Sequence, residues 1–260
     1  MLTADDLDHF RDRGYVYVRG AFGRDEAAAM RDVTWAALER TGIRRDDPAT
    51  WTVEAPSHLQ RLKRSPVFRA VGSARTRGAI DDLLGPGCWQ SPRDWGAFFV
   101  LFPTPRPWTV PHKAWHADHD YALPLEPLRE LKVQALYGDV EPRAGGMTVV
   151  AGSHLAVAAH PLPPGTSPAT ARKAVMGSHR YLAELSQPGG AAERIARFVD
   201  RDEQVGDARL RVVELAGSAG DVVLLHPLLL HTRPANSGAA PRFLLNRDLY
   251  QRTDHGPAAA

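Results

Sequence analysis

Short runs of β-favouring residues, separated by turn signals, fill most of the chain after residue 90 and constrain the fold more than any other feature. Branched and aromatic residues in such runs are typical of strands, and the Gly, Asn and Ser clusters between them are typical of turns. This pattern predicts an antiparallel β-core, closed into a barrel or packed as a sandwich. The six runs cover residues 96–102, 131–137, 147–150, 210–215, 222–225 and 242–246.

The first 90 residues follow a different pattern, which predicts helices around this core. Thr3 and Asp6 resemble a capping box, and Gly14 stands where a helix C-cap is expected. Apolar positions further along recur at a helical period. The predicted helices cover residues 4–13, 24–40 and 67–84, with a short strand at 15–18 and an irregular segment at 42–66.

A long segment interrupts the predicted strands, and we expect it to form a lid over a cavity of the β-core. Its start, residues 160–170, holds four prolines and no hydrophobic period, and helices are predicted at 171–185 and 191–199. The alternative is that residues 160–190 form a fixed surface segment that does not act as a lid. The predicted organisation is a single domain of residues 1–260, with a helical part at 1–90, a β-core at 91–250 and the lid-like insertion at 156–205.

Composition and charge exclude several classes of protein. The 260 residues carry a formal net charge of +2, without the basic stripe that a nucleic-acid binder would show. The chain starts with acidic residues, and no apolar run approaches the roughly 20 residues of a membrane helix. The single cysteine, Cys88, allows no intramolecular disulfide. We therefore expect a cytoplasmic protein without nucleic-acid or membrane partners, and its oligomeric state stays open.

His116 and Asp118 form the only His-x-Asp sequence of the chain. Residues two apart in an extended segment point to the same side, so these two could present a nitrogen and an oxygen to one metal ion. With this many His and Asp residues, about one such pair is expected by chance. The pair alone therefore does not establish a metal site.

Two further histidines, His226 and His231, end an apolar run that follows the turn at Gly220 and Asp221. A histidine in so apolar a run costs desolvation free energy unless it binds a metal ion or a backbone group. For either histidine taken singly, the backbone hydrogen bond is the simpler explanation. The apolar run alone does not indicate whether His226 or His231 is the metal ligand.

Arg242 supplies a third element, because it opens the last predicted strand. If this strand pairs with the preceding one as a hairpin, Arg242 and His231 approach the same cavity. A buried guanidinium needs an anion, and a ligand carboxylate fits that need. Two histidines and one carboxylate on one face of an iron ion leave three positions open, two for 2-oxoglutarate and one for dioxygen. Arg242 would then bind the distal carboxylate of 2-oxoglutarate.

Together these motifs resemble the phytanoyl-CoA dioxygenase family of Fe(II)- and 2-oxoglutarate-dependent oxygenases, over nearly the whole chain. That family places its iron histidine eleven residues before its cosubstrate arginine, and 242 − 231 = 11, so the resemblance selects His231 over His226. Ala151 stands where proline is usual. The similar segments are the start around Gly14 and Tyr15, the pair His116 and Asp118, residues 145–154 ending in Gly-Ser-His, Gly220-Asp221, His226-Pro227, His231 and Arg242.

The resemblance implies a double-stranded β-helix, or jelly roll, with flanking helices. It implies that His116, Asp118 and His231 bind Fe(II), and that Arg242 and Gln134 bind 2-oxoglutarate, although the family often has an aromatic residue at the position of Gln134. Dioxygen is the implied second cosubstrate. The implied reaction is hydroxylation of a small molecule, with release of succinate and CO2, in the tailoring of a specialised metabolite. Related halogenases have Gly or Ala in place of Asp118, which argues against halogenation.

Several alternatives stay open. The same site can desaturate, cyclise or epimerise a substrate, and the sequence does not separate these outcomes from hydroxylation. A cupin-like metalloenzyme that does not use 2-oxoglutarate would leave Arg242 without its anion. The alternative from another class is a β-barrel protein that binds a small molecule and keeps a vestigial metal site. The intact metal set and Arg242 argue against it.

Overall fold

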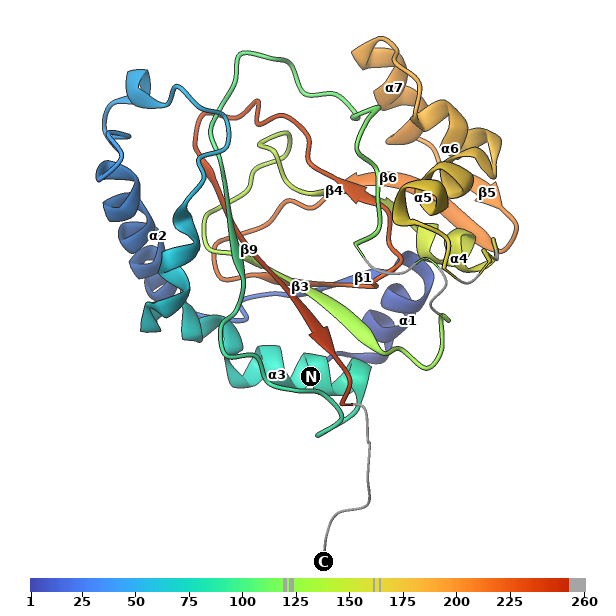
Figure 1. The fold of residues 1–260 in the computed structure, drawn as a ribbon, viewed down its shortest axis with the longest axis horizontal. Helices are drawn as coiled ribbons and strands as arrows, with labels where there is room; N and C mark the ends of the chain where they lie inside the picture. The colour runs from blue at the N-terminus through green and yellow to red at the C-terminus, as the bar shows by residue number, and fades with distance from the viewer. Residues whose placement is uncertain (119–120, 122–123, 161, 164, 253–260) are drawn as a thin grey trace, which may run out of the picture.

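Two antiparallel β-sheets pack against each other at the centre of the fold (Figure 1). The computed structural model describes residues 1–118, 121, 124–160, 162–163 and 165–252. The predicted fold class, a jelly-roll β-core with flanking helices, is confirmed. In spatial order, the five-stranded sheet contains β1 (Tyr15–Val18), β7 (Val222–Leu225), β3 (Glu130–Leu136), β9 (Arg242–Tyr250) and β2 (Ala97–Leu101), and the four-stranded sheet contains β5 (Glu203–Val205), β6 (Ala208–Glu214), β4 (Thr148–Ala151) and β8 (His231–Thr232).

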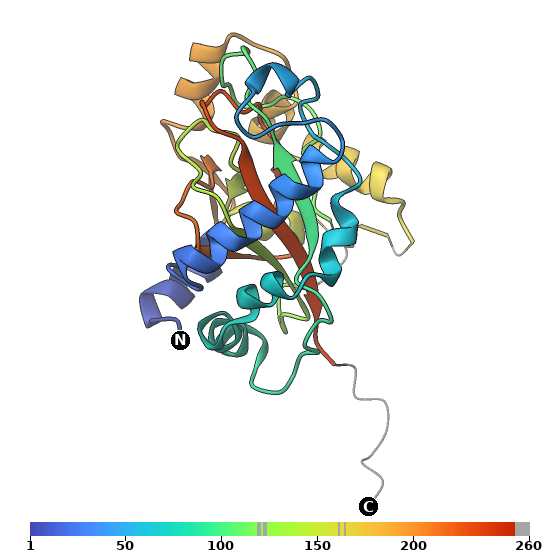
Figure 2. The same cartoon turned by 90° about the vertical axis from the view of Figure 1, so that its left-hand side faces the viewer.

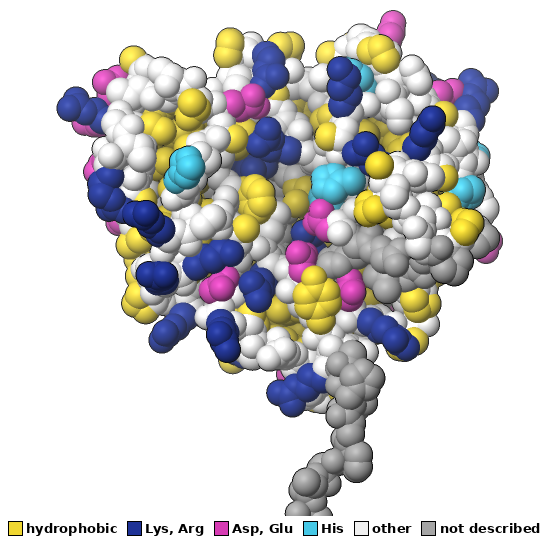
Figure 3. Space-filling view, in the orientation of Figure 1, with side chains coloured by type: hydrophobic (Ala, Val, Ile, Leu, Met, Phe, Trp, Pro, Cys, Tyr) yellow, Lys and Arg dark blue, Asp and Glu magenta, His cyan; other side chains and the backbone are white. Residues whose placement is uncertain are grey.

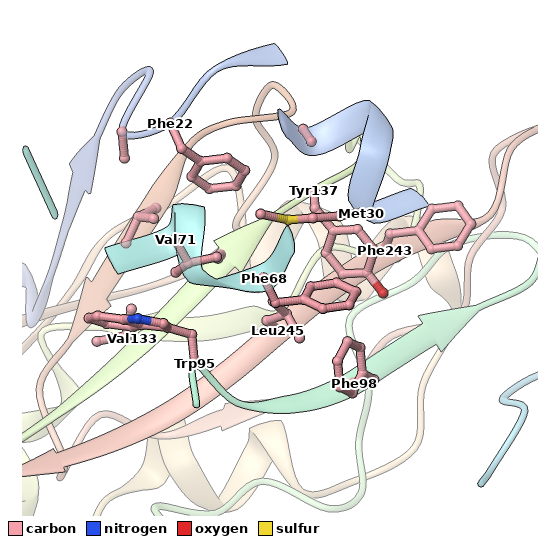
Figure 4. Close-up of a cluster of buried hydrophobic side chains, with 14 of the residues drawn as sticks. Phe22, Met30, Phe68, Val71, Trp95, Phe98, Val133, Tyr137, Phe243 and Leu245 are labelled. Atoms are coloured by element: carbon pink, nitrogen blue, oxygen red, sulfur yellow. The ribbon is translucent and has the colours of Figure 1, made fainter. Parts of the chain in front are cut away.

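Helices of the N-terminal part cover the outer face of the five-stranded sheet, with α2 running across it (Figure 2). One buried cluster joins the two layers, with Met30 and Phe68 on the helical side and Val133 and Leu245 on the strands (Figure 4). Full burial of a side chain of this kind stabilises a fold by about 1.5–3 kcal/mol. This part contains α1 (Ala4–Arg13), α2 (Arg24–Glu39), α3 (Ala74–Leu84) and the 3-10 helices η1 (Pro48–Thr50), η2 (Leu59–Arg64) and η3 (Pro66–Gly72).

Local side-chain contacts set the ends of these helices. The Thr3 hydroxyl accepts from the backbone N–H of Asp6 at 3.2 Å, as the capping box predicts. The helix expected at residues 67–84 is instead divided at Ser73, whose hydroxyl accepts from the N–H of Thr76 at 3.1 Å and caps α3. The segment expected to be irregular contains η1 and η2, and β1 makes the N-terminal part contribute a strand to the sheet.

The insertion between β4 and β5 folds into helices that pack against the four-stranded sheet (Figure 1). Val175, Leu182 and Phe198 from these helices join Val150 and Val212 from the strands in a second buried cluster. The helix expected over residues 171–185 is divided in two, and the Gly-Ser-His segment begins a helix that the sequence did not predict. The four helices are α4 (Ser153–Ala158), α5 (Pro168–Gly177), α6 (Arg180–Leu185) and α7 (Ala191–Phe198).

Arg194 on α7 ties this insertion to the segment that precedes the His-x-Asp motif. The residue is buried, and its guanidinium donates to the carbonyl oxygens of Val110 at 2.8 Å, Pro111 at 3.0 Å and Leu185 at 2.8 Å. Such charge-assisted hydrogen bonds hold the helices of the insertion to the chain beside the candidate site. Within the described residues, no helix has both the length and the apolar character that crossing a membrane requires.

The alternation of β3 and β9 decides which side chains face the space between the sheets. Val133 packs outward against the helices, whereas Leu136 and Leu244 pack inward between the sheets. Residues two or four positions from these inward leucines share their side of the strand. The inward polar side chains are therefore Lys132 and Gln134 on β3 and Arg242, Asn246 and Asp248 on β9.

Candidate metal centre and cosubstrate pocket

Three side chains from distant parts of the chain meet at one point. His116, Asp118 and His231 each offer a ligand atom, and these atoms lie within 4.8 Å of one another. His116 Nε2 is 3.1 Å from Asp118 Oδ1, and His231 Nε2 is 3.4 Å from Asp118 Oδ2. Two imidazoles and one carboxylate are the donor set of mononuclear non-haem iron sites. The structure thus brings together the three residues that the resemblance selected.

Backbone contacts hold both histidines in place. The N–H of His116 donates to the carbonyl of His231 at 3.1 Å, and the N–H of His231 donates to the carbonyl of His116 at 2.9 Å. His116 Nδ1 lies 2.8 Å from the carbonyl oxygen of Ala114, and His231 Nδ1 lies 2.9 Å from that of Leu229. Because a carbonyl can only accept, we assign a proton to each Nδ1. Each Nε2 is then the nitrogen that can bind a metal ion.

Asp118 is held in its ionised form, which is the form that binds a metal ion. Burial alone would raise the pKa of Asp118, but hydrogen bonds from His116 and His231 and the charge of Lys132 hold that pKa well below its ordinary value. The hydrogen bond to Asp118 in turn raises the pKa of His116. A divalent cation would take the place of the protons on the two Nε2 atoms, because metal ions and protons compete for the same lone pairs.

His226, the other histidine of the apolar run, lies in a different environment. Its Nδ1 accepts from the N–H of Leu228 at 3.1 Å, and its ring centroid is 4.8 Å from that of His154. Burial lowers the pKa of His226 to about 3 and that of His154 to about 4. Both rings line a surface cleft of about 390 Å³ that none of the three clustered residues lines. His226 is thus a buried neutral histidine outside the candidate metal centre.

Arg242 and His231 reach the space between the sheets from opposite sheets, so the predicted hairpin is wrong. β8, which begins with His231, pairs with β4, whereas β9 pairs with β2 and β3. The connecting segment crosses from one sheet to the other and is fixed by Asn236, whose Nδ2 donates to the carbonyls of Leu101 at 3.0 Å and Ala240 at 2.9 Å. The two side chains therefore face the same space between the sheets because the sheets pack together, and not because their strands pair.

The guanidinium of Arg242 is buried without a full set of partners. Nη1 donates to the carbonyl of Gly145, while Nε has no hydrogen-bond partner among the described residues. Burial lowers the pKa of Arg242 to about 9, and the charge of Arg233 adds to this effect. The carboxylate of Glu214 opposes it, but Glu214 already accepts from two backbone N–H groups at 2.6 and 2.9 Å. A ligand carboxylate would supply the anion that this guanidinium lacks.

Gln134 and Asn246 add polar atoms to the same inward face. Gln134 is fully buried, and neither atom of its amide has a partner among the described residues. Asn246 stands opposite Gln134 in the β3–β9 register, and its Oδ1 also lacks a partner there. Because buried polar groups normally form hydrogen bonds, these atoms indicate a polar ligand. With Arg242, they fit a dicarboxylate that carries an oxo group.

Lys132 and Asp248 belong to this face too, and the sequence analysis missed them. Lys132 Nζ contacts Asp118 Oδ2 and lies 3.0 Å from Asp248 Oδ1. Burial alone would lower the pKa of Lys132, but the charges of Asp248 and Asp118 hold it above its ordinary value. Strand periodicity was the available signal, since Lys132 lies two residues before Gln134 in an otherwise apolar run.

The centre opens to the exterior on one side. The side chain of His116 is 41% exposed and that of Asp118 is 29% exposed, whereas that of His231 is only 7% exposed. On the face seen in Figure 3, a histidine lies close to several acidic side chains near the middle of the surface. A substrate can therefore approach from the side of His116, while Arg242 is closed off from water.

Solved structures share this architecture. AviO1 from Streptomyces viridochromogenes Tue57 is 18% identical, with a TM-score of 0.56 and full coverage of both chains. HygX from Streptomyces hygroscopicus, solved with nickel and 2-oxoglutarate, is 18% identical, with a TM-score of 0.54 over 96% of this chain and 87% of its own. SnoK, a non-haem α-ketoglutarate-dependent carbocyclase from nogalamycin biosynthesis, is 20% identical, with a TM-score of 0.50 over 96% and 84%. At these identities the likeness shows the fold.

A family comparison goes further. No curated protein matches the chain. The family model of phytanoyl-CoA dioxygenase (PhyH), however, matches residues 10–244, a span that includes both histidines, Asp118 and Arg242. The predicted cofactors, iron and 2-oxoglutarate, are those of this family, and the described side chains fit both. The chain belongs to the phytanoyl-CoA dioxygenase family and is a non-haem Fe(II)- and 2-oxoglutarate-dependent oxygenase.

Proposed function

We propose that His116, Asp118 and His231 bind Fe(II), that Arg242 and Gln134 bind 2-oxoglutarate, and that the chain hydroxylates a small molecule. The observation that carries this proposal is the three-residue cluster, with ligand atoms within 4.8 Å, beside a buried polar face that includes an under-partnered arginine. A vestigial barrel would have no reason to keep a buried guanidinium without its anion.

Each residue has a definite task in this proposal. The two histidines are oriented through Nδ1 by the carbonyls of Ala114 and Leu229, so their Nε2 atoms point to a common centre. Arg242 binds the distal carboxylate of the cosubstrate through its free Nε. Gln134 donates to or accepts from the cosubstrate through an amide that has no other described partner.

The iron, when bound, supplies the redox chemistry that couples dioxygen to the oxidative decarboxylation of 2-oxoglutarate. In hydroxylation, one atom of dioxygen would end in succinate as CO2 is released, and the other would be inserted into a C–H bond of the substrate as a hydroxyl group. The protein orients the reactants and excludes water around the distal carboxylate, since Arg242 is only 4% exposed. The more exposed side of the centre, at His116, is left for the substrate.

The substrate class we propose is a specialised metabolite. HygX has been solved with hygromycin B bound, and SnoK and the epimerase SnoN come from nogalamycin biosynthesis. These structures share the fold of this chain, which supports a tailoring role by analogy. Cyclisation and epimerisation in such neighbours keep those outcomes, and desaturation, as alternatives to hydroxylation for the same site.

Product mass separates these outcomes. Purified protein is incubated with Fe(II), 2-oxoglutarate, dioxygen and a panel of candidate metabolites, and succinate and products are followed by mass spectrometry. Hydroxylation adds one oxygen atom, and desaturation or oxidative cyclisation removes two hydrogen atoms. Epimerisation leaves the mass unchanged but moves the chromatographic peak. A protein that binds a metabolite but forms no succinate with any member of the panel would favour the binding-protein alternative.

A further inference from the structure

Lys132 is a buried cation placed directly on the carboxylate of the candidate metal centre. Its side chain is 7% exposed, and Nζ contacts Asp118 Oδ2 and lies 3.0 Å from Asp248 Oδ1. The β3–β9 register sets Lys132 opposite Asp248, so the two side chains leave adjacent strands on the same face. The sheet therefore fixes the ammonium group, and this rigid group fixes one oxygen of Asp118.

A buried ammonium next to a site for a dication needs an explanation. Its positive charge opposes cation binding, so the residue does not serve simply to attract the metal. Its desolvation is offset by two carboxylates, and only one of them, Asp248, lies outside the candidate centre. The arrangement is instead suited to occupying one of the two oxygens of Asp118.

A carboxylate can bind a metal ion through one oxygen or through both. The 2-His-1-carboxylate site leaves three positions open only when the carboxylate uses a single oxygen, and 2-oxoglutarate takes two of these. If both oxygens of Asp118 bound the metal, the third position would be lost. Hydrogen bonds to the second oxygen are what keep a ligating carboxylate in one mode.

We propose that Lys132, held by Asp248, is a positioning residue that restricts Asp118 to binding the metal through one oxygen and so keeps one coordination position open for dioxygen. This inference rests on the proposed metal site. It concerns the geometry of that site and adds no step to the reaction.

Nitric oxide tests this without turnover, because it occupies the dioxygen position of Fe(II) and gives an electron paramagnetic resonance signal. Anaerobic protein is loaded with Fe(II) and 2-oxoglutarate and titrated with nitric oxide. Lys132→Met, which keeps the length of the side chain and removes the charge, should bind nitric oxide at least about tenfold more weakly than the parent protein. The affinity of Lys132→Met for Fe(II) should not fall, because the substitution removes the positive charge of Lys132 and frees the second oxygen of Asp118. Lys132→Arg should recover most of the nitric oxide binding.

Arg247→Met is the matched control. Arg247 is the neighbour of Asp248 on β9, points to the opposite face and pairs with Asp94 at 3.5 Å, so its loss removes one charge from the same strand and should leave both affinities unchanged. The double variant Lys132→Met, Asp248→Asn removes the charges of both members of the ion pair. It should fold, as monitored by circular dichroism, and show the same loss of nitric oxide binding.

Each outcome supports or overturns the positioning role of Lys132. Unchanged nitric oxide affinity in Lys132→Met, or a loss of Fe(II) affinity that parallels a loss of thermal stability, would make Lys132 a structural residue and overturn the inference. Failure of both the single and the double variant to fold would do the same. If the parent protein itself binds no Fe(II), the proposed metal site fails first, and the two failures are therefore distinguishable.

Discussion

Replacement of Arg242 distinguishes a cosubstrate-binding arginine from a structural one. Burial, with a smaller contribution from the charge of Arg233, lowers the pKa of its guanidinium from 12.5 to about 9, which corresponds to a net unfavourable free energy of roughly 5 kcal/mol for the charged form. A carboxylate placed at the free Nε would recover part of this free energy. A charge-assisted hydrogen bond contributes about 1.5–3 kcal/mol, or a factor of about 10 to 100 in affinity.

Arg242→Met should therefore weaken 2-oxoglutarate binding by about 10- to 100-fold and leave Fe(II) affinity unchanged. Arg242→Lys keeps the charge but not the planar fork, so its loss should be about tenfold. Without cosubstrate, Arg242→Met should be at least as stable as the parent protein, because it removes a buried cation that lacks an anion. The dissociation constant of 2-oxoglutarate is measured by titrating it into anaerobic Fe(II)-loaded protein, and the free energy of unfolding is measured by chemical denaturation.

Arg233→Met is the charge-matched control, because Arg233 is exposed and contributes to the same local potential. Its effect on 2-oxoglutarate affinity should stay below about fivefold, as for other exposed charges. Arg242 is a structural residue if the dissociation constant of 2-oxoglutarate is unchanged in both folded Arg242 variants. Arg242 is likewise structural if Arg242→Met, without cosubstrate, is several kcal/mol less stable than the parent protein.

Three further predictions concern stability and the insertion. In the folded protein the pKa values of His154 and His226 lie below the ordinary 6.5, so each histidine contributes stability above pH 6.5 that is lost as the pH falls. Between pH 7 and pH 5 the free energy of unfolding should fall by about 2 kcal/mol per histidine, measured by chemical denaturation in the presence of a chelator. A free energy of unfolding that does not change over this pH range would contradict the prediction. Arg194→Met should lower the free energy of unfolding by about 2–4 kcal/mol, because it leaves buried carbonyl groups without donors. Arg197→Met on the same helix should lower it by less than about 1 kcal/mol, because the ion pairs of Arg197 are partly exposed. Equal losses of stability in the two variants would argue against the anchoring role of Arg194. If residues 160–190 form a lid, limited proteolysis there should slow when cosubstrate and substrate bind, and equal rates would support a fixed decoration.

Local patterns in the sequence were sufficient for most strands and helices. The capping box at Thr3 and the apolar run at Val222–Leu225 each act through neighbours in sequence, and both elements form where expected. The helix predicted at 67–84 is divided because the Ser73 hydroxyl offers the backbone a cap, which competes with a continuous helix. Helical period alone does not register this competition.

Long-range pairing was not predictable in the same way. The spacing of His231 and Arg242 fits a hairpin, yet the two residues begin strands of different sheets. Asn236 fixes the crossing segment between them by donating to the distant carbonyl of Leu101. The position of Lys132 in the site was not predicted, for a related reason. A lone lysine in a strand is usually exposed, and its burial follows only from the register that sets it opposite Asp248. His116 and Asp118 were recognised from the geometry of residues two apart in an extended segment, whereas only the family spacing selected His231 over His226.

The most direct test of the proposed site is the visible charge-transfer absorption that forms when Fe(II) and 2-oxoglutarate bind together without oxygen. The parent protein should develop this band. His231→Ala should not develop it, because it lacks one of the three ligands, whereas His226→Ala should retain it, because His226 lies among Phe10 and His154, outside the cluster. A band that persists in folded His231→Ala protein and disappears in folded His226→Ala protein would contradict the assignment of the iron ligands.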